Sequence, residues 1–370
     1  MDGGIPYVIA TLSKPADDDI ENRVLVARLK GAARTIDVDG VAVEAVGSYG
    51  TVFSTPLAPA FPGALARAAR QADVVVHHAP FPLADLALAR LQSSAALIVY
   101  WHADIMGRAL LKLPFNAAIR RTLERADRII VADRSTMMSS NVLPAFEHKC
   151  TVVPYGADID FWATCTVAES ARAAALRKEF PRMILATGRL VPYKGYDVLI
   201  QALQNVDGHV VFIGEGPLLP ALKAQAERLG VADRVTFKGR IAVDEVKAHL
   251  HAAKVFAFPS VTSAEAFGIV QLEAMAAGLP IVNTSLPTAV PGIARDDVEA
   301  LTVAIGRADQ LAAALSRILD EPGLAARLGD AAQLRARSVY SEAQFVARMK
   351  AIYREVITQR QHGKENTGSR

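Results

Sequence analysis

The stretch from Ala257 to Thr284 constrains the fold more than any other part of the chain. An apolar run ends at Pro259, a loop of small residues follows, and apolar residues at helical spacing then lead to Gly278 and a second apolar run. This order predicts a strand, a helix and a parallel strand, which together form half of an α/β unit. Such folds bind ligands at the carboxyl ends of their strands. Glu265 lies there, and Glu273 follows after seven intervening residues.

Apolar runs and helical segments alternate over most of the chain, which predicts parallel strands joined by crossover helices. The length of 370 residues suits two domains, each with its own core. Pro154 and Gly156 interrupt the pattern, and the segment from there to Thr166 is interpreted as an interdomain linker. The clearest predicted strands are 96–101 and 128–132 before the linker, and 183–187, 209–213, 234–237 and 255–258 after it.

Composition excludes several classes of protein. Hydrophobic residues make up 51% of the chain and charged residues 21%, with a net charge of +3, so no broad nucleic-acid surface is expected. Cys150 and Cys165 have no metal-ligand spacing and form no disulfide framework, which suits a reducing cytoplasm. No apolar run approaches the roughly 20 residues of a membrane span, and no signal peptide is visible. The expected location is cytoplasmic, with at most peripheral membrane contact.

Charged residues also follow the strand 183–187. Arg189 and Lys194 flank a turn shaped by Pro192 and Gly195, where their charges would neutralise a diphosphate. The backbone amides of Gly268 and its successors are helix-start donors and suit the same ligand. Taken singly, two acids on a helix or two cations near a helix start are more often surface residues.

The combination resembles a known family. Glu265-x7-Glu273, the following Gly-Leu-Pro-Ile-Val and the turn Gly188-Arg-Leu-x-x-x-Lys-Gly195 are similar to signatures of the retaining family 4 glycosyltransferases. The resemblance covers about 24–357. It implies a GT-B fold, an α/β architecture of two Rossmann-like domains with parallel sheets facing across a crevice. The implied domains are 1–157 on the acceptor side and 166–340 for the nucleotide sugar. A helix at 341–357 would cross back to the first domain, and the polar tail 358–370 is expected to be disordered.

The resemblance assigns roles to single residues. Glu265 would hold hydroxyls of the donor sugar, and Glu273 would hold the ribose of the nucleotide. Arg189 and Lys194 would stabilise the departing diphosphate, and His102 would contact the donor sugar near the acceptor, with Asp104 orienting it. His77 and His78 also end a strand but match no catalytic position. The remaining cofactor-binding candidates, which would surround the nucleotide, are Gly4, Gly188, Gly214, Glu215, Gly216, Arg240, Ile241, Phe267, Gly268, Ile269 and Val270.

No cofactor or metal is expected. Asp158-Ile159-Asp160 has the spacing of a metal-binding Asp-x-Asp motif, but it lies in the linker rather than after a nucleotide-binding strand. We interpret it as structural. The positive side chains would do the work of a divalent cation.

The implied reaction is transfer of a hexose from a UDP- or GDP-sugar to an acceptor hydroxyl with retention at the anomeric carbon. The run from Trp101 to Gly156 resembles bacterial transferases that act on envelope polysaccharide or polyprenyl-diphosphate-linked acceptors, several of which use GDP-mannose. No acid is an evident nucleophile, so same-face departure and attack is favoured over double displacement. Two alternatives stay open: a degenerate subunit that only binds nucleotide sugar, and another GT-B enzyme such as a sugar-nucleotide epimerase or hydrolase.

Two features depart from the family pattern or extend it. Gly3-Gly4 resembles the glycine loop that follows the family's first strand, and that strand is absent before it, so we expect the native protein to need a longer amino terminus. The predicted helix 107–125 carries several cations and leucines and suits docking on an anionic membrane. The alternative for this helix is that its apolar side packs on the sheet and its arginines face solvent.

Overall fold

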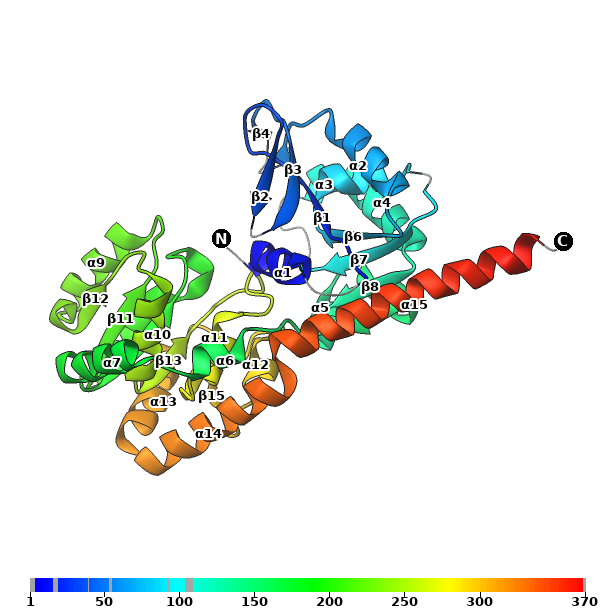
Figure 1. Cartoon of the computed structure of the whole chain (residues 1–370). Helices are drawn as coiled ribbons and strands as arrows, with labels where there is room; N and C mark the ends of the chain where they lie inside the picture. Colours follow the sequence, from blue (N-terminus) through cyan, green and yellow to red (C-terminus); the bar gives the residue numbers. More distant parts are fainter. Residues whose placement is uncertain are drawn as a thin grey trace. The chain divides into compact units, whose positions relative to one another are not determined.

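A computed structural model describes residues 4–15, 19–38, 40–52, 55–91, 93–103 and 109–368, without the side chains of 109–114 and 363–368. The chain divides into two compact units (Figure 1). Unit 1 comprises the described residues up to Val153 together with those from Val346 onward, and unit 2 comprises Pro154–Phe345.

Unit 1 contains two sheets and a hairpin. A four-stranded parallel sheet has the order β6-β7-β8-β9, and a three-stranded sheet has the order β1-β3-β2, in which β1 is parallel and β2 antiparallel to β3. The elements are α1 (Gly4–Ser13), β1 (Arg23–Ala27), β2 (Arg34–Val38), β3 (Val41–Val46), β4 (Thr51–Val52), β5 (Thr55–Pro56), α2 (Phe61–Arg70), β6 (Val74–Ala79), α3 (Pro82–Leu88), β7 (Ala96–Trp101), α4 (Ala109–Arg125), β8 (Arg128–Val131), α5 (Arg134–Ser139), η1 (Leu143–Lys149) and β9 (Cys150–Val152).

The core of unit 1 joins both sheets. The central strand β7 is buried at every residue, because helices cover both faces of the sheet around it. Val46 of β3 and Leu97 of β7 belong to the same hydrophobic cluster. Among the described residues, no strand pairing joins β1 to β6, so the three-stranded and four-stranded sheets of unit 1 are separate. The need for a longer amino terminus stays a prediction.

Unit 2 is a doubly wound domain. Its six strands are all parallel, in the order β12-β11-β10-β13-β14-β15. The elements are α6 (Ile159–Ala163), α7 (Val167–Glu179), β10 (Met183–Thr187), η2 (Pro192–Lys194), α8 (Tyr196–Ala202), η3 (Leu203–Asn205), β11 (His209–Ile213), α9 (Leu219–Arg228), η4 (Ala232–Arg234), β12 (Val235–Phe237), α10 (Val243–Ala252), β13 (Val255–Phe258), α11 (Val270–Ala276), β14 (Ile281–Thr284), α12 (Val290–Ile293), β15 (Ala300–Val303), α13 (Ala308–Asp320) and α14 (Pro322–Val339).

The order of strands in unit 2 creates a switch point. The chain leaves β10 toward β11 on one side of the sheet and returns to β13 on the other side of β10. At such a point the loops after the two neighbouring strands open in opposite directions, which leaves space for a ligand at their carboxyl ends. The loops after β10 and β13 carry Lys194 and Glu265, respectively.

The last helix, α15 (Glu342–Gly368), begins in unit 2 and belongs to unit 1 from Val346 onward. In the described part of the tail that was expected to be disordered, the helix continues to Gly368. Arg360 explains this, since it pairs with Asp127 at 2.9 Å and donates to the carbonyl of Ser94 at 3.2 Å. Extending an existing helix with Gln, Arg and Lys costs little once the next turn is anchored.

Candidate active site

The site in unit 2 depends on a close approach between two loops. Gly195 ends the turn η2 with a φ of 65°, and a Cβ there would lie 2.1 Å from the carbonyl oxygen of Pro259. The amide of Val261 donates to the carbonyl of Tyr193 at 2.8 Å, which ties the loop after β13 to the turn after β10. Only glycine allows this contact. The approach brings Lys194 to Glu265.

Lys194 and Glu265 form a buried ion pair. The Lys194 Nζ lies 2.5 Å from the Glu265 Oε2, and both residues are 7% exposed. The Ser260 hydroxyl donates to the same carboxylate oxygen at 3.2 Å. The ammonium also lies 4.9 Å from the centre of the Phe258 ring. A charge is stable inside a protein only when it is paired in this way, so the pair places a cation and an acid together at the switch point.

Glu273 lies on α11, in the first turn of the helix. Burial raises the pKa of its carboxyl to about 7, and the positive charge of Lys194 opposes that shift. In the loop before α11, Gly268 has a φ of 85°, and a Cβ there would lie 2.5 Å from the Phe258 ring. The loop therefore passes directly over the end of β13. With this packing, Glu273 lies close enough to Lys194 for the positive charge of the lysine to lower the pKa of the carboxyl.

Two further strand ends are joined to this cluster through the backbone. Each hydrogen bond runs from a backbone amide to a backbone carbonyl. The amide of Gly188 donates to the carbonyl of Ile213 at 2.9 Å, and that of Leu190 donates to the carbonyl of Glu215 at 2.9 Å. The amide of Gly214 donates to the carbonyl of Gly239 at 2.8 Å. The turns after β10, β11 and β12 thus form one connected edge. Arg189, Glu215 and Arg240 are exposed along it. A row of exposed charges and tight turns at parallel strand ends suits a phosphate-bearing ligand.

A second cluster lies in unit 1 at the carboxyl ends of β6 and β7. His102 Nε2 and His78 Nδ1 are 2.9 Å apart, and both rings stack with Tyr100. The ring centroid of Tyr100 lies 4.7 Å from that of His102 and 5.7 Å from that of His78. Burial lowers the pKa of His78 to about 3 and holds the pKa of His102 well below its usual range, and the neighbouring histidines add to both shifts. The lowered pKa values favour the neutral form of both rings, and a hydrogen bond joins them. His77 forms a separate buried pair with Asp85 at 2.9 Å.

Comparison with known proteins identifies the family. The model of glycosyl transferases group 1 matches residues 167–335, and the model of glycosyltransferase family 4 matches residues 3–161. The D-rhamnosyltransferase WbpZ of Pseudomonas aeruginosa is 32% identical over 74% of this chain and 71% of its own length. The chain is a family 4 glycosyltransferase.

Other relatives and solved structures agree. A GDP-mannose-dependent alpha-(1-6)-phosphatidylinositol monomannoside mannosyltransferase of Mycobacterium tuberculosis is 33% identical over 70% of each chain. The crystal structure of HepE from Anabaena in complex with UDP has a TM-score of 0.78 at 20% identity, covering 95% of this glycosyltransferase and 96% of that chain. The expected GT-B fold is confirmed.

The structure brings together most of the predicted residues of unit 2. Gly188, Gly214 and Gly216 form the connected turns, with Ile241 following Arg240 after β12. The side chain of Phe267 packs against Tyr155, with ring centroids 4.6 Å apart, so only its backbone is available to a ligand. Val270 starts α11, and Ile269 is the residue before it. Their assignment to the nucleotide stays a prediction.

Some predicted residues stand apart from this cluster. Gly4 is the first residue of α1 in unit 1, rather than part of a loop. Asp104 lies outside the described residues. Asp158 caps α6 by accepting from the amide of Phe161 at 3.0 Å, and Asp160 pairs with Arg337 at 3.3 Å, in agreement with the structural role expected for both. Within the part of the chain that the structure describes, no three His, Cys, Asp or Glu side chains are grouped to hold a metal ion.

Sequence reasoning missed the supporting residues. Ser260 is fully buried and contacts Glu265, while the Thr284 hydroxyl donates to the carbonyl of Ser260 at 2.6 Å. The Tyr196 hydroxyl donates to the carbonyl of Thr187 at 2.9 Å, which joins the start of α8 to the end of β10. All four lie at or just after a strand end, or at the start of the helix that follows one. That position is the only signal in the sequence that could have pointed to them.

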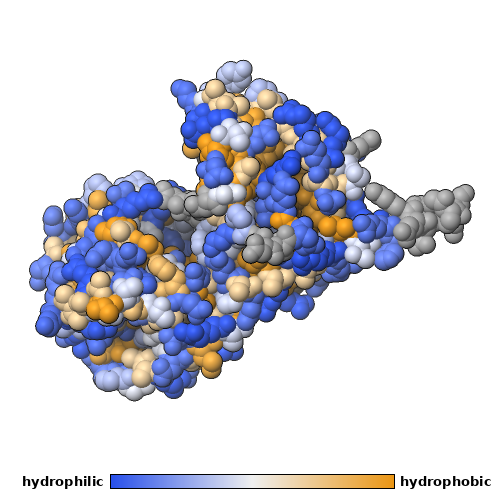
Figure 2. All heavy atoms as spheres, in the orientation of Figure 1, coloured by the Kyte–Doolittle hydropathy of each residue, from blue (hydrophilic) through white to orange (hydrophobic). Residues whose placement is uncertain are grey.

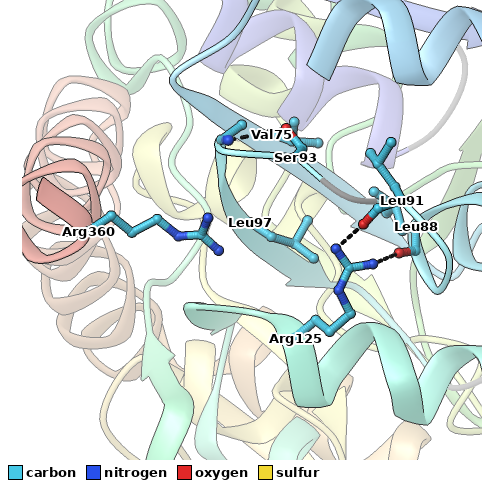
Figure 3. A pocket seen from close by; sticks show the side chains of 8 residues that line it. Val75, Leu88, Leu91, Ser93, Leu97, Arg125 and Arg360 are labelled. Atoms are coloured by element: carbon cyan, nitrogen blue, oxygen red, sulfur yellow. Dashed lines mark hydrogen bonds between the residues drawn. The ribbon is translucent and has the colours of Figure 1, made fainter. Parts of the chain in front are cut away.

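A small cavity in unit 1 does not belong to the site. Arg125 and Arg360 line it, with Leu97 on its floor (Figure 3). Arg125 donates to the carbonyls of Leu88 and Leu91, which joins the end of α4 to the end of α3. The cavity has room for about one water, far less than the roughly 300 Å³ or more of a ligand pocket. Its arginines therefore have a structural role.

Proposed function

We propose that this glycosyltransferase is a retaining, metal-independent hexosyltransferase. Its donor is a UDP- or GDP-sugar, and its acceptor is a polysaccharide or a polyprenyl-diphosphate-linked oligosaccharide. The observation that carries the proposal is the buried pair of Lys194 and Glu265 at the switch point of unit 2, beside Glu273. A cation for the diphosphate, an acid for the sugar and an acid for the ribose occur there together.

The charges suit departure of a nucleoside diphosphate. Negative charge grows on the phosphate as the bond to the sugar breaks, and in this proposal the charges of Lys194 and Arg189 offset it. The Lys194 ammonium is held by Glu265 before the donor arrives, so little reorganisation is needed during the reaction. Ser260 fixes the Glu265 carboxylate, whose second oxygen is left for a sugar hydroxyl. This acid is engaged by a cation and a hydroxyl, so we favour same-face attack by the acceptor over a covalent intermediate on Glu265.

We further propose mannose as the transferred hexose. The proposal rests on the relatives, since the Mycobacterium tuberculosis enzyme is described as GDP-mannose-dependent and an Escherichia coli relative as an O-antigen chain mannosyltransferase. An acceptor linked to a lipid would lie at a membrane surface. No helix within the described residues is long and apolar enough to cross a membrane. In this proposal the enzyme reaches such an acceptor by contact with the surface of the bilayer.

A donor screen tests the proposal. The purified protein is incubated with GDP-mannose, UDP-glucose and related nucleotide sugars, with and without a chelator, and binding and turnover are followed by mass spectrometry. We expect turnover of one GDP- or UDP-hexose that the chelator leaves unchanged, and a product with the anomeric configuration of the donor by NMR. An inverted product would refute retention. Binding without turnover would indicate a degenerate subunit, and conversion of the donor without an acceptor would indicate an epimerase or hydrolase.

A further inference from the structure

Two loops at one end of the three-stranded sheet of unit 1 expose apolar side chains. We call residues 28–33 and 47–57 the loop pair, of which 53 and 54 lie outside the description. Leu29 is 71% exposed and Tyr49 83%, followed by Leu57 at 49% and Val52 at 46%. Among the described residues of unit 1, seven large hydrophobic side chains are exposed, and these four are the majority. Exposed apolar residues on a protein surface are normally scattered singly, whereas these four are concentrated in one place.

Hydrogen bonds make the loop pair one surface. The amides of Gly31 and Ser48 each donate to the other's carbonyl, at 2.8 Å and 2.9 Å. The amide of Tyr49 donates to the carbonyl of Leu57 at 3.1 Å, and the Ser48 hydroxyl lies 3.4 Å from the carbonyl of Leu29. The exposed side chains therefore come from neighbouring backbone segments. These side chains stand on backbone that is held by hydrogen bonds, and not on a loose chain end.

The charge of the loop pair itself is positive. The sequence from Val24 to Ile36 contains three cations, Arg28, Lys30 and Arg34, and no acid, and the sequence from Ala45 to Ala72 contains no acid either. The nearest acid on the sheet, Glu44, lies across from Thr35 and pairs with Arg67 at 3.4 Å. Lys30 and Arg34 are exposed. Figure 2 shows hydrophilic and apolar surface intermixed at the end of unit 1 where β2, β3 and β4 lie. Apolar tips and the exposed cations Lys30 and Arg34 thus share one surface.

We propose that the loop pair attaches the protein to an anionic lipid bilayer. Leucine and tyrosine side chains on short loops can enter the interface between headgroups and acyl chains, while Lys30 and Arg34 meet the negative surface. A protein partner is a poorer match, because a stable interface uses about 20–30 residues on each side and four side chains fall far short of that. The proposal rests on the function proposed above, in which a lipid-linked acceptor brings the enzyme to a membrane.

The loop pair is also a better candidate than α4, the helix predicted from the sequence to dock on a membrane. Ile119 of α4 is 3% exposed and packs in the core of unit 1. Arg120 pairs with Glu124 at 3.2 Å, and Arg125 is bound to carbonyls of α3. Ile119 therefore faces the core rather than a membrane, since this side of the helix covers the sheet. Arg120 and Arg121 are exposed and provide a matched control.

Vesicle co-sedimentation of the full chain tests the proposal. The probes are vesicles of phosphatidylcholine alone and of phosphatidylcholine with phosphatidylglycerol. We expect attachment to the anionic vesicles only, weakening as salt shortens the range of the charges. Each cation near an anionic surface strengthens attachment about fivefold, so Lys30→Gln with Arg34→Gln should weaken it about 25-fold. Leu29→Ser with Tyr49→Ser should weaken it by about tenfold or more.

The control is Arg120→Gln with Arg121→Gln, which removes the same charge from another exposed part of unit 1 and should leave attachment nearly unchanged. All substituted side chains are exposed, so the variants should fold, and circular dichroism checks this. The proposal is wrong if no vesicle is bound, if the loop variants bind as wild type, if only the α4 control loses attachment, or if the loop variants change the oligomeric state by light scattering instead. Transfer to a water-soluble acceptor should survive in the loop variants. That separate assay distinguishes failure of the membrane surface from failure of the proposed function.

Discussion

Lys194→Ala should destabilise the protein as well as impair turnover, because it leaves Glu265 buried without a counter-ion. The side chains of the pair are only 9% and 10% exposed. Removing one partner of such a pair costs about 3–5 kcal/mol. The Ser260 hydroxyl still donates to the Glu265 carboxylate, so we expect the lower end, about 3 kcal/mol of unfolding free energy. With a urea dependence of about 1–3 kcal/mol/M, the unfolding midpoint should fall by about 1–3 M.

A second substitution separates the two effects. Glu265→Gln in the Lys194→Ala background removes the unpaired charge, and about 2 kcal/mol of the lost unfolding free energy should return. Turnover should not return, because the cation for the diphosphate is still missing. Urea titration followed by circular dichroism measures the first quantity, and donor turnover measures the second.

Lys247→Ala is the matched control. Lys247 pairs with Glu169 at 3.0 Å in the same unit, with side chains 5% and 10% exposed, and it lies on α10 rather than at a strand end. This variant should lose comparable stability while retaining wild-type affinity for the nucleotide sugar. If Lys194→Ala instead unfolds at the same urea concentration as wild type, or if Glu265→Gln does not restore stability, the ion pair does not have the role inferred for it.

Three further predictions concern other parts of the molecule. Because burial raises the pKa of Glu273 to about 7, the folded protein binds an extra proton between about pH 4.5 and 7; stability should fall as the pH rises through that window, and Glu273→Gln should remove this dependence in urea titrations. The pKa of His78 is lowered to about 3, so the unfolded chain binds the extra proton and the pH dependence of stability is reversed. Stability should be lost as the pH falls below about 6.5, and histidine NMR at pH 5 should show a neutral ring. Arg360→Ala should cost about 1 kcal/mol or less and increase hydrogen exchange in the last turns of α15, whereas unchanged exchange would show that Asp127 does not anchor the helix.

The sequence was most informative where strands are buried on both faces. The predicted strands 183–187, 209–213 and 255–258 have the observed bounds of β10, β11 and β13, because continuous apolar runs ended by glycine or proline leave little freedom. The antiparallel strand β2 was missed, since only Ile36 and Val38 of its residues are partly buried and the rest are exposed. The helical tail was missed because its anchor, Arg360 on Asp127, joins residues far apart in the sequence.

The position of the site could be predicted from the sequence, but the contacts between its side chains could not. A position after a strand can be recognised from the order of residues in the sequence. Lys194, Glu265 and Glu273 could therefore be assigned to one edge of the sheet from the sequence alone. Their pairing could not, since it depends on how closely the turn at Gly195 approaches Pro259. Support from Ser260 and Thr284 was hidden for the same reason.

Burial of an ion pair does not by itself mark a functional site. Lys247 with Glu169 is as buried as Lys194 with Glu265, and it joins two helices, α10 and the start of α7. Its carboxylate also completes the cap of α7, accepting from the amide of Thr166 at 2.6 Å, so each member has a structural task. The pair at the switch point joins two loops rather than two helices. It lies where strands β10 and β13 diverge, and the charge of Lys194 also reaches Glu273. That difference in position, rather than any difference in burial, is the physical reason to assign ligand binding to one pair and packing to the other.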